Sequence, residues 1–143
     1  MAIAIEKSVD MPAAPEKVWT TATDLSRWGE WLVMHRSWKS DVPDQLAPGS
    51  TMVGVASVLN MPNTITWTVE ETSGSALSIS GTGMAGAKVR IRLAVEPAGG
   101  GTLLTVATEF EGQMIVGAIA GAIERAAKVD IDRSLANLAG LVA

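Results

Sequence analysis

Residues 88–110 read KVRIRLAVEPAGGGTLLTVATEF, and this stretch decides the fold. Before the glycines, Val89, Ile91 and Leu93 alternate with charged or small residues, and apolar residues recur in phase after them. A period of two predicts strands that each have one dry face and one face in water. The breaker-rich residues 97–101 between the two runs predict a turn, so the stretch is expected to form an antiparallel hairpin.

The same alternation extends towards the amino terminus and predicts five more strands. Breaker residues separate them, including a turn at residues 61–63 and a wide hairpin at residues 81–86. The glycine-rich hairpin lacks the terminal Lys-Ser/Thr pair of a phosphate-binding loop and precedes a strand rather than a helix. Clean alternation in these runs is typical of an antiparallel sheet. The five strands are predicted over residues 2–11, 33–39, 51–59, 63–71 and 75–82.

Two short helices are predicted between the first strand and the second. Pro15 suits the first turn of a helix, where its missing N–H does no harm, and the carboxylate of Glu16 suits the helix dipole. Asp24 or Ser26 can cap the next helix, whose apolar residues include two tryptophans. This order, in which two short helices directly follow the first strand, is informative about the fold class.

The carboxy-terminal residues change to a helical period. Apolar residues recur there every three or four positions, which predicts one long amphipathic helix. Glu124 and Lys128 lie four residues apart on its polar side, as do Lys128 and Asp132. The sheet and this helix are expected to enclose the interior, because the dry face of the sheet needs a cover. The apolar stripe comprises Ile115, Ile119, Ile123, Ala127, Ile131, Leu135, Leu138 and Val142.

Residues 112–123 are unusual because nearly every position is small or apolar. Three interpretations stay open for this segment. It is a fully enclosed helix end where Gly117 and Gly121 approach the sheet, a mobile lid over a cavity, or an exposed apolar patch for a partner or a membrane surface. The segment is well short of the roughly 20 residues that a membrane span requires.

Composition and charge exclude several classes of function. The 143 residues fit one domain, residues 1–143, and a hydrophobic content of 48% excludes disorder. With 11 basic and 15 acidic residues the net charge is −4, so the basic surface of a nucleic-acid binder is missing. No cysteine and one histidine, His35, exclude disulfides and the common zinc sites, and we expect no metal and no cofactor. The start of the sequence lacks the features of a signal peptide, so a cytoplasmic protein without a transmembrane segment is expected.

Three stretches carry a resemblance to a known superfamily: APEKVW at residues 14–19, DLSRWGEW at residues 24–31, and the GGGT of the late hairpin. In this order they make the chain resemble the START-like (SRPBCC) superfamily, which includes Bet v 1-like and polyketide cyclase/dehydrase and lipid transport proteins. The resemblance covers the whole chain. It implies an α+β helix-grip fold, with a curved seven-stranded antiparallel sheet around the long carboxy-terminal helix and a cavity for an apolar small molecule. Small actinobacterial members have a similar run to residues 24–38, and at least one is the toxin of a type II toxin–antitoxin pair.

The implied cavity would be lined by bulky side chains of the dry face and of the helix start. Core packing competes with this role for each of them and is the favoured interpretation for Trp19. A surface or capping role is favoured for His35 over general-base catalysis, because it alternates with Met34 and Arg36. No serine or threonine occupies a nucleophile motif, and no catalytic residue is expected. The candidate ligand-binding residues are Trp28, Trp31, Trp38, Met52, Trp67, Met84, Ile91, Phe110, Met114, Ile115 and Ile119.

We therefore expect a carrier or sensor that binds an apolar or amphipathic small molecule, such as a lipid or a polyketide-like compound. Burial of apolar area would supply the affinity. Two alternatives stay open. One is a growth-inhibiting toxin neutralised by a small antitoxin protein, which rests on the resemblance alone. The other is a cyclase- or dehydratase-type enzyme, which is less favoured because the dry-face positions are nearly all apolar. A homodimer also stays open.

Overall fold

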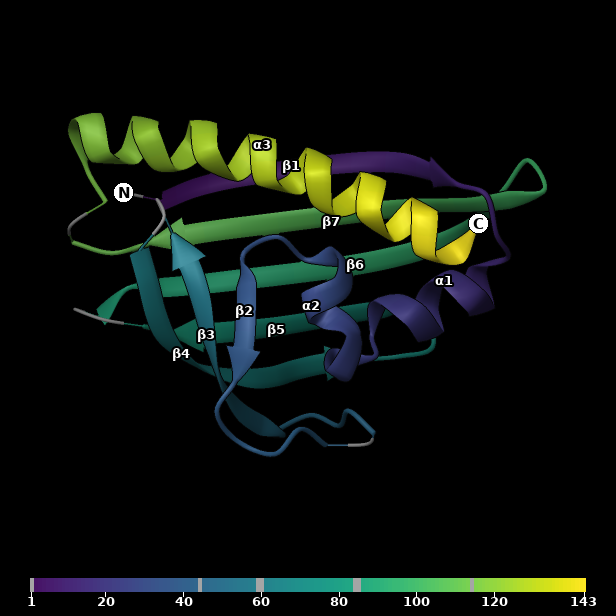
Figure 1. Ribbon diagram of the computed structural model, residues 1–143, viewed down its shortest axis with the longest axis horizontal. Coiled ribbons are helices and arrows are strands. Elements are labelled where there is room, and N and C mark those ends of the chain that lie inside the picture. Colours follow the sequence, from purple (N-terminus) through teal and green to yellow (C-terminus); the bar gives the residue numbers. More distant parts are fainter. Residues whose placement is uncertain (1, 44, 59–60, 84–85, 114) are drawn as a thin grey trace.

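The computed structural model describes residues 2–43, 45–58, 61–83, 86–113 and 115–143. Within these ranges, seven strands form one antiparallel sheet in the order β1-β7-β6-β5-β4-β3-β2. Figure 1 shows that the sheet curls around the long carboxy-terminal helix, which confirms the predicted architecture. The strands are β1 (Ala2–Met11), β2 (His35–Trp38), β3 (Thr51–Val58), β4 (Met61–Thr72), β5 (Ala76–Thr82), β6 (Lys88–Ala98) and β7 (Gly101–Glu111).

The turn between β6 and β7 is tighter than the predicted residues 97–101. Ala98 already pairs with Gly101, so Gly99 and Gly100 alone connect the strands. Their φ angles are 52° and 85°, in the left-handed region that glycine adopts without strain. Two consecutive residues of this kind allow a two-residue turn whose twist matches that of the strands, and both strands therefore continue up to it.

Short helices lead from β1 at one edge of the sheet to β2 at the other (Figure 1). α1 (Pro15–Ala22) has proline in its first turn, as predicted. Asp24 caps the single 3-10 turn η1 (Leu25–Arg27), because its carboxylate accepts a hydrogen bond from the backbone N–H of Ser26 at 3.1 Å. α2 (Trp28–Trp31) follows directly and buries both of its tryptophans.

β4 begins earlier than the sequence predicts. A turn is expected at residues 61–63, but Pro62 lies inside the strand and pairs with Ser57 of β3. The pairing of β4 with β5 starts only at Thr66, so this end of β4 has a neighbour on one side. Proline is tolerated in such a position, because no second strand needs its missing N–H.

α3 (Gly117–Val142) lies across the inner face of the sheet, beside β1 and β7 (Figure 1). The predicted stripe is buried with one exception: Ile119 is 47% exposed, and Ala120 is buried in its place. With 3.6 residues per turn, each four-residue step drifts by about 40°, which puts Ile119 about 120° around the helix from Ile131. No helix in the described part of the chain is long and apolar enough to cross a membrane.

Ion pairs hold the outer side of α3. Nζ of Lys128 lies 3.6 Å from the carboxylate of Glu124, as their four-residue spacing predicts. Asp132 also lies four residues from Lys128, but its carboxylate pairs with Lys7 of β1. This pair links the helix to the edge of the sheet, although an exposed pair of this kind contributes at most about 1 kcal/mol.

Candidate functional site: an apolar cavity under the long helix

A cavity of about 50 Å³ lies between α3, α2 and the inner face of β6 and β7. Every second side chain of β6 and β7 points inward, where it meets the apolar stripe of α3. The wall is mainly apolar. Its residues are Trp28, Trp31, Leu32, Met34, Ser57, Ile91, Leu93, Val106, Thr108, Phe110, Ile123, Ala126, Ala127, Asp130, Ile131, Ser134 and Leu135.

Two hydrogen bonds join α3 to the end of α2 and to the segment that connects α2 with β2. The buried hydroxyl of Ser134 accepts a bond from the backbone N–H of Val33 at 2.9 Å. Asn137 donates from its side-chain amide to the carbonyl oxygen of Trp31 at 3.4 Å. These bonds give the cavity a defined wall on this side and satisfy the hydroxyl of Ser134.

The two tryptophans of α2 differ in their hydrogen bonding. Trp28 and Trp31 both line the cavity and pack edge to face, with ring centroids 6.5 Å apart. Nε1 of Trp28 donates to the carbonyl of Ala22 at 3.0 Å. Nε1 of Trp31 is buried and has no partner among the described residues, and the same holds for the hydroxyl oxygen of Thr108 on β7. Two residues of the cavity wall therefore each hold a buried polar atom without a partner among the described residues.

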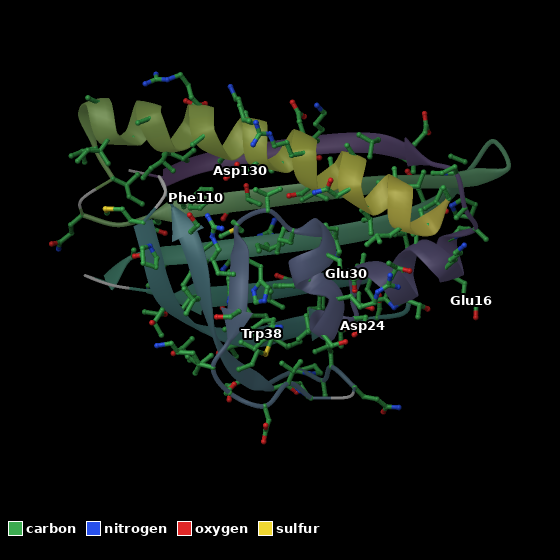
Figure 2. All side chains as sticks on the ribbon, in the orientation of Figure 1. Glu16, Asp24, Glu30, Trp38, Phe110 and Asp130 are labelled. Carbon is green, nitrogen blue, oxygen red and sulfur yellow. The ribbon has the colours of Figure 1, made fainter. Side chains whose placement is uncertain are left out.

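Asp130 is the one ionisable side chain on the wall among the described residues. Figure 2 shows it on α3, with Phe110 of β7 below it. Burial raises the pKa of Asp130, and the positive charges of Arg133 and Arg36 offset part of this effect. The carboxyl of Asp130 therefore holds its proton more readily than an exposed aspartate does. The described residues contain no group of three or more His, Asp or Glu side chains that could hold a metal ion.

An aromatic cluster adjoins the cavity at Trp28. The ring centroids of Trp38 and Trp67 lie 5.7 Å and 6.4 Å from that of Trp28. Nε1 of Trp38 donates to a backbone carbonyl of η1 at 2.8 Å. Two glycines make room for these rings: a Cβ on Gly54 would lie 2.9 Å from Trp38, and one on Gly81 would lie 2.8 Å from Trp67. The cluster therefore packs tightly behind one side of the wall.

His35 packs against the same cluster and is half-buried. Its ring centroid lies 4.5 Å from that of Trp38 and 6.1 Å from that of Trp28. The surface or capping role predicted from the sequence rests on regular alternation along β2. The pairing of β2 with β3 instead shifts register between His35 and Ser37, so the alternation is interrupted there. Burial lowers the pKa of His35, so the neutral ring is the stable form beside the tryptophans at neutral pH.

The structure distributes the predicted ligand-binding residues over several settings. Ile115 is buried just before α3, whereas Ile119 faces outward. Met84 and Met114 lie outside the described residues. Three more pack in or beside the aromatic cluster, away from the wall, and these are Trp38, Met52 and Trp67. Four line the cavity together, and these are Trp28, Trp31, Ile91 and Phe110.

The remaining wall residues are not among the predicted ligand contacts, although four of them belong to the predicted stripe of the long helix, and these are Ile123, Ala127, Ile131 and Leu135. Leu93 and Val106 share the phase of Ile91 and Phe110, but phase alone does not separate a cavity wall from a packed core. A usable signal exists for Thr108, which is a polar residue at a dry-face position of β7. Asp130 offers a similar signal, because it is a charged residue directly beside Ile131 of the apolar α3 stripe.

Residues 112–123 are enclosed on one side only. Ile115 and Ile123 are buried, but Val116 is 51% exposed and Ile119 faces outward as described above. The interpretation as a fully enclosed helix end is therefore wrong. α3 begins only at Gly117, and Val116 directly before it has an extended backbone, so Val116 does not belong to the helix. The lid and the apolar patch stay open as interpretations.

Comparison with protein families and relatives agrees with the fold. Residues 2–143 match the model of the family described as polyketide cyclase / dehydrase and lipid transport. The uncharacterized protein Rv1546 of Mycobacterium tuberculosis is 38% identical over 138 residues, which is 96% of both chains. Toxin Rv0910 of the same organism is 34% identical over 131 residues, which is 91% of both chains.

A solved structure shows the same architecture. The START superfamily protein from Mycobacterium smegmatis superposes with a TM-score of 0.77 over 97% of this chain and 96% of that chain. The two sequences are 16% identical, so the likeness concerns the fold alone. The START-like fold expected from residues 14–19 and 24–31 is thereby confirmed.

Proposed function

Because the chain belongs to the polyketide cyclase / dehydrase and lipid transport family, we propose that it binds an apolar or amphipathic small molecule in the cavity under α3. The observation that carries the proposal is the cavity itself, which has a mainly apolar wall inside an otherwise packed core. Burial of a ligand there would contribute roughly 25 cal/mol per Å² of apolar surface. Four of the eleven ligand-binding residues predicted from the sequence line this cavity and are the proposed contacts: Trp28, Trp31, Ile91 and Phe110.

The size of the cavity implies that the protein opens to accept its ligand. Its volume of about 50 Å³ is far below the roughly 300–1,000 Å³ of typical small-molecule sites. Ile123 of α3 forms part of the wall. Two apolar residues nearby are exposed: Val116, which directly precedes α3, and Ile119, which lies in its first turn. We propose that this first part of α3 moves outward on binding, since it gives up little buried surface when it does.

Carriage or sensing is favoured over cyclase or dehydratase chemistry. General acid–base catalysis needs an ionisable group held against the reacting atoms, and usually a second group that takes the opposite role. Asp130 is the one carboxylate among the described wall residues, and the other wall residues carry apolar, indole or hydroxyl groups. This set of groups suits orientation of a bound molecule better than proton transfer.

Native mass spectrometry of the purified protein, followed by extraction of any bound compound, tests the proposal. Titration with N-phenyl-1-naphthylamine, an uncharged dye that fluoresces in apolar surroundings, gives a second measurement. In Ala127→Phe the new ring projects from α3 into the cavity, and we expect dye affinity to fall at least about tenfold because the ring takes the ligand's place.

Ala118→Phe is the matched control, since it adds the same ring to an exposed position of α3. We expect it to keep the affinity of the natural protein. A protein that carries no compound and takes up no dye would overturn the proposal. Equal loss of affinity in the two variants would show that the dye binds elsewhere.

A second candidate is a growth-inhibiting toxin, and it is supported by the relative named Toxin Rv0910. Controlled expression in a mycobacterial host tests it, with and without the adjacent small gene that would encode an antitoxin. Growth arrest that the small gene relieves would favour this function. Unchanged growth, combined with a bound small molecule, would favour carriage or sensing.

A further inference from the structure

Two buried polar groups on the cavity wall have no hydrogen-bond partner among the described residues. These are Nε1 of Trp31, whose residue is 2% exposed, and the hydroxyl oxygen of Thr108, whose residue is 5% exposed. Trp31 belongs to α2 and Thr108 to β7, and both residues line the cavity from different elements, with the two polar atoms buried beside it.

Leaving such groups unpaired lowers stability, because each loses its bonds to water on folding and gains none in return. The local structure satisfies comparable groups nearby: Nε1 of Trp28 has the carbonyl of Ala22, and the hydroxyl of Ser134 has the N–H of Val33. Valine would fill the volume of Thr108, and phenylalanine most of that of Trp31, without a polar atom that loses its bonds to water. The unpaired groups are thus best explained by a partner that enters the cavity.

The chemistry of the two groups restricts that partner. The indole N–H of Trp31 only donates, so it needs an acceptor, while the hydroxyl of Thr108 donates or accepts. A carbonyl or hydroxyl oxygen can pair with both. Asp130 opposes an anionic group because its carboxylate lies on the wall, whereas Arg36 and Arg133 are not among the wall residues.

We propose that Trp31 and Thr108 recognise an uncharged oxygen of the ligand, so that the cavity takes a neutral molecule with an apolar body and a ketone or hydroxyl group. This inference rests on the proposed function and specifies the class of ligand. The indole N–H and the threonine hydroxyl set the orientation of the polar end, and the remaining wall buries the apolar body. A fatty-acid carboxylate is disfavoured by Asp130.

Three probes of nearly equal shape separate these features. They are 2-acetylnaphthalene, which has a ketone, 2-ethylnaphthalene, which lacks it, and 2-naphthoate, which is an anion. We expect the ketone to bind about 3- to 10-fold more tightly than the hydrocarbon, the gain typical of one net hydrogen bond, and the anion to bind most weakly. In ¹H–¹⁵N spectra the indole N–H signal of Trp31 should move downfield with the ketone and stay near its place with the hydrocarbon.

Two variants assign the effect to the named groups. Trp31→Phe and Thr108→Val should each reduce the ratio of ketone affinity to hydrocarbon affinity towards one, and this ratio is the measured quantity because both residues also contribute apolar surface to the wall. Trp38→Phe is the control, because its N–H already bonds to a backbone carbonyl and its ring is not on the wall. This variant should keep the preference of the natural protein. The spectra of the natural protein decide the question even if one variant fails to fold.

The outcomes distinguish this inference from the proposed function. If neither neutral probe binds, both proposals fall. If the two bind equally well, or the Trp31 signal does not respond to the ketone, the cavity is a ligand site but the recognition of an oxygen is overturned. An indole N–H that already shows a hydrogen-bonded shift without ligand, and keeps it with the ketone, would mean that water alone is its partner and would overturn the inference too.

Discussion

The two halves of α3 differ in how firmly they are held. In the carboxy-terminal half, residues 130–142, Leu138 is fully buried at 0% exposure, and Ser134 and Asn137 bond to the α2–β2 connection. The amino-terminal half, residues 117–129, has no side-chain cap and buries three residues, Ala120, Ile123 and Ala127, against five in the other half. One helix therefore combines an anchor with a part that is weakly held, and the cavity lies where the two meet.

This difference follows from elementary packing physics. A buried aliphatic side chain contributes about 1.5–3 kcal/mol relative to an exposed one, so the half with more buried residues resists opening. Local opening with low free energy is expected where buried contacts are few. The amino-terminal half of α3 can therefore move to give a ligand access to the cavity while the carboxy-terminal half stays folded.

The largest expected effect tests the anchor. Leu138→Ala removes a fully buried side chain and leaves a void, and we expect the free energy of unfolding to fall by about 3 kcal/mol. Ile119→Ala in the other half is the control, since half of that side chain is already in water, and it should cost less than about 1 kcal/mol. Urea denaturation of both variants measures this. Similar losses would contradict the contrast between the halves.

A pair of glycine substitutions tests the weakly held half. Gly121→Ala and Gly140→Ala each replace a glycine inside α3, one in each half, and each should stabilise the protein by about 0.5–1 kcal/mol. A Cβ at Gly140 meets open space, and one at Gly121 meets only the guanidinium end of Arg125 at 3.3 Å. Thermal unfolding measures the common gain.

The rates of ligand exchange should then separate the pair. Gly121→Ala stiffens the half that we propose to move, so dissociation of N-phenyl-1-naphthylamine should slow about threefold, as expected for a gain of that size. Gly140→Ala stiffens the anchored half and should leave the rate unchanged. Stopped-flow fluorescence provides the measurement. Equal slowing by both would mean that the helix moves as one body, and no slowing by either would place the moving element elsewhere.

The sequence predicts the fold well because period and turn chemistry act locally. The alternation around Ile91 assigns its face correctly, and the glycines of the β6–β7 turn mark the hairpin. The misassignments have physical causes as well. Pro62 lies in a strand because β4 has no neighbouring strand on one side at that point. Ile119 faces outward because residues spaced four apart drift around the helix.

The site was only partly accessible from the sequence. In the sequence, Trp28 and Trp67 are both candidate aromatic residues of the cavity wall. In the structure Trp28 lines the cavity, whereas Trp67 packs behind it, with ring centroids 6.4 Å apart. Which of two buried rings borders a void depends on distances between elements, and periodicity carries no such information. Thr108 was the accessible clue, because a polar residue on a dry face needs a partner.

The smallest expected effect lies at the boundary between the halves, where Asp130 faces the cavity. Burial raises the pKa of this carboxyl in the folded protein, so the unfolded chain holds fewer protons than the folded one between the two pKa values. Stability therefore falls as the pH rises through that interval. Asp130→Asn removes the ionisation, and at neutral pH the variant should be more stable by less than about 1 kcal/mol, because Arg133, Arg36 and solvent screen the charge.

The difference between Asp130→Asn and the natural protein should vanish below about pH 4, where the carboxyl is protonated in both states. Comparing the two proteins at each pH cancels the titration of His35, whose lowered pKa makes both of them lose stability as the pH falls below the ordinary range of histidine. Urea denaturation from pH 3 to pH 8 measures the difference. If Asp130→Asn is instead less stable than the natural protein at neutral pH, the carboxylate stabilises the fold. Asp130 would then be an ion-pair partner of Arg133 and Arg36 in the anchored half, and the proposed rejection of anions by the cavity would lose its support.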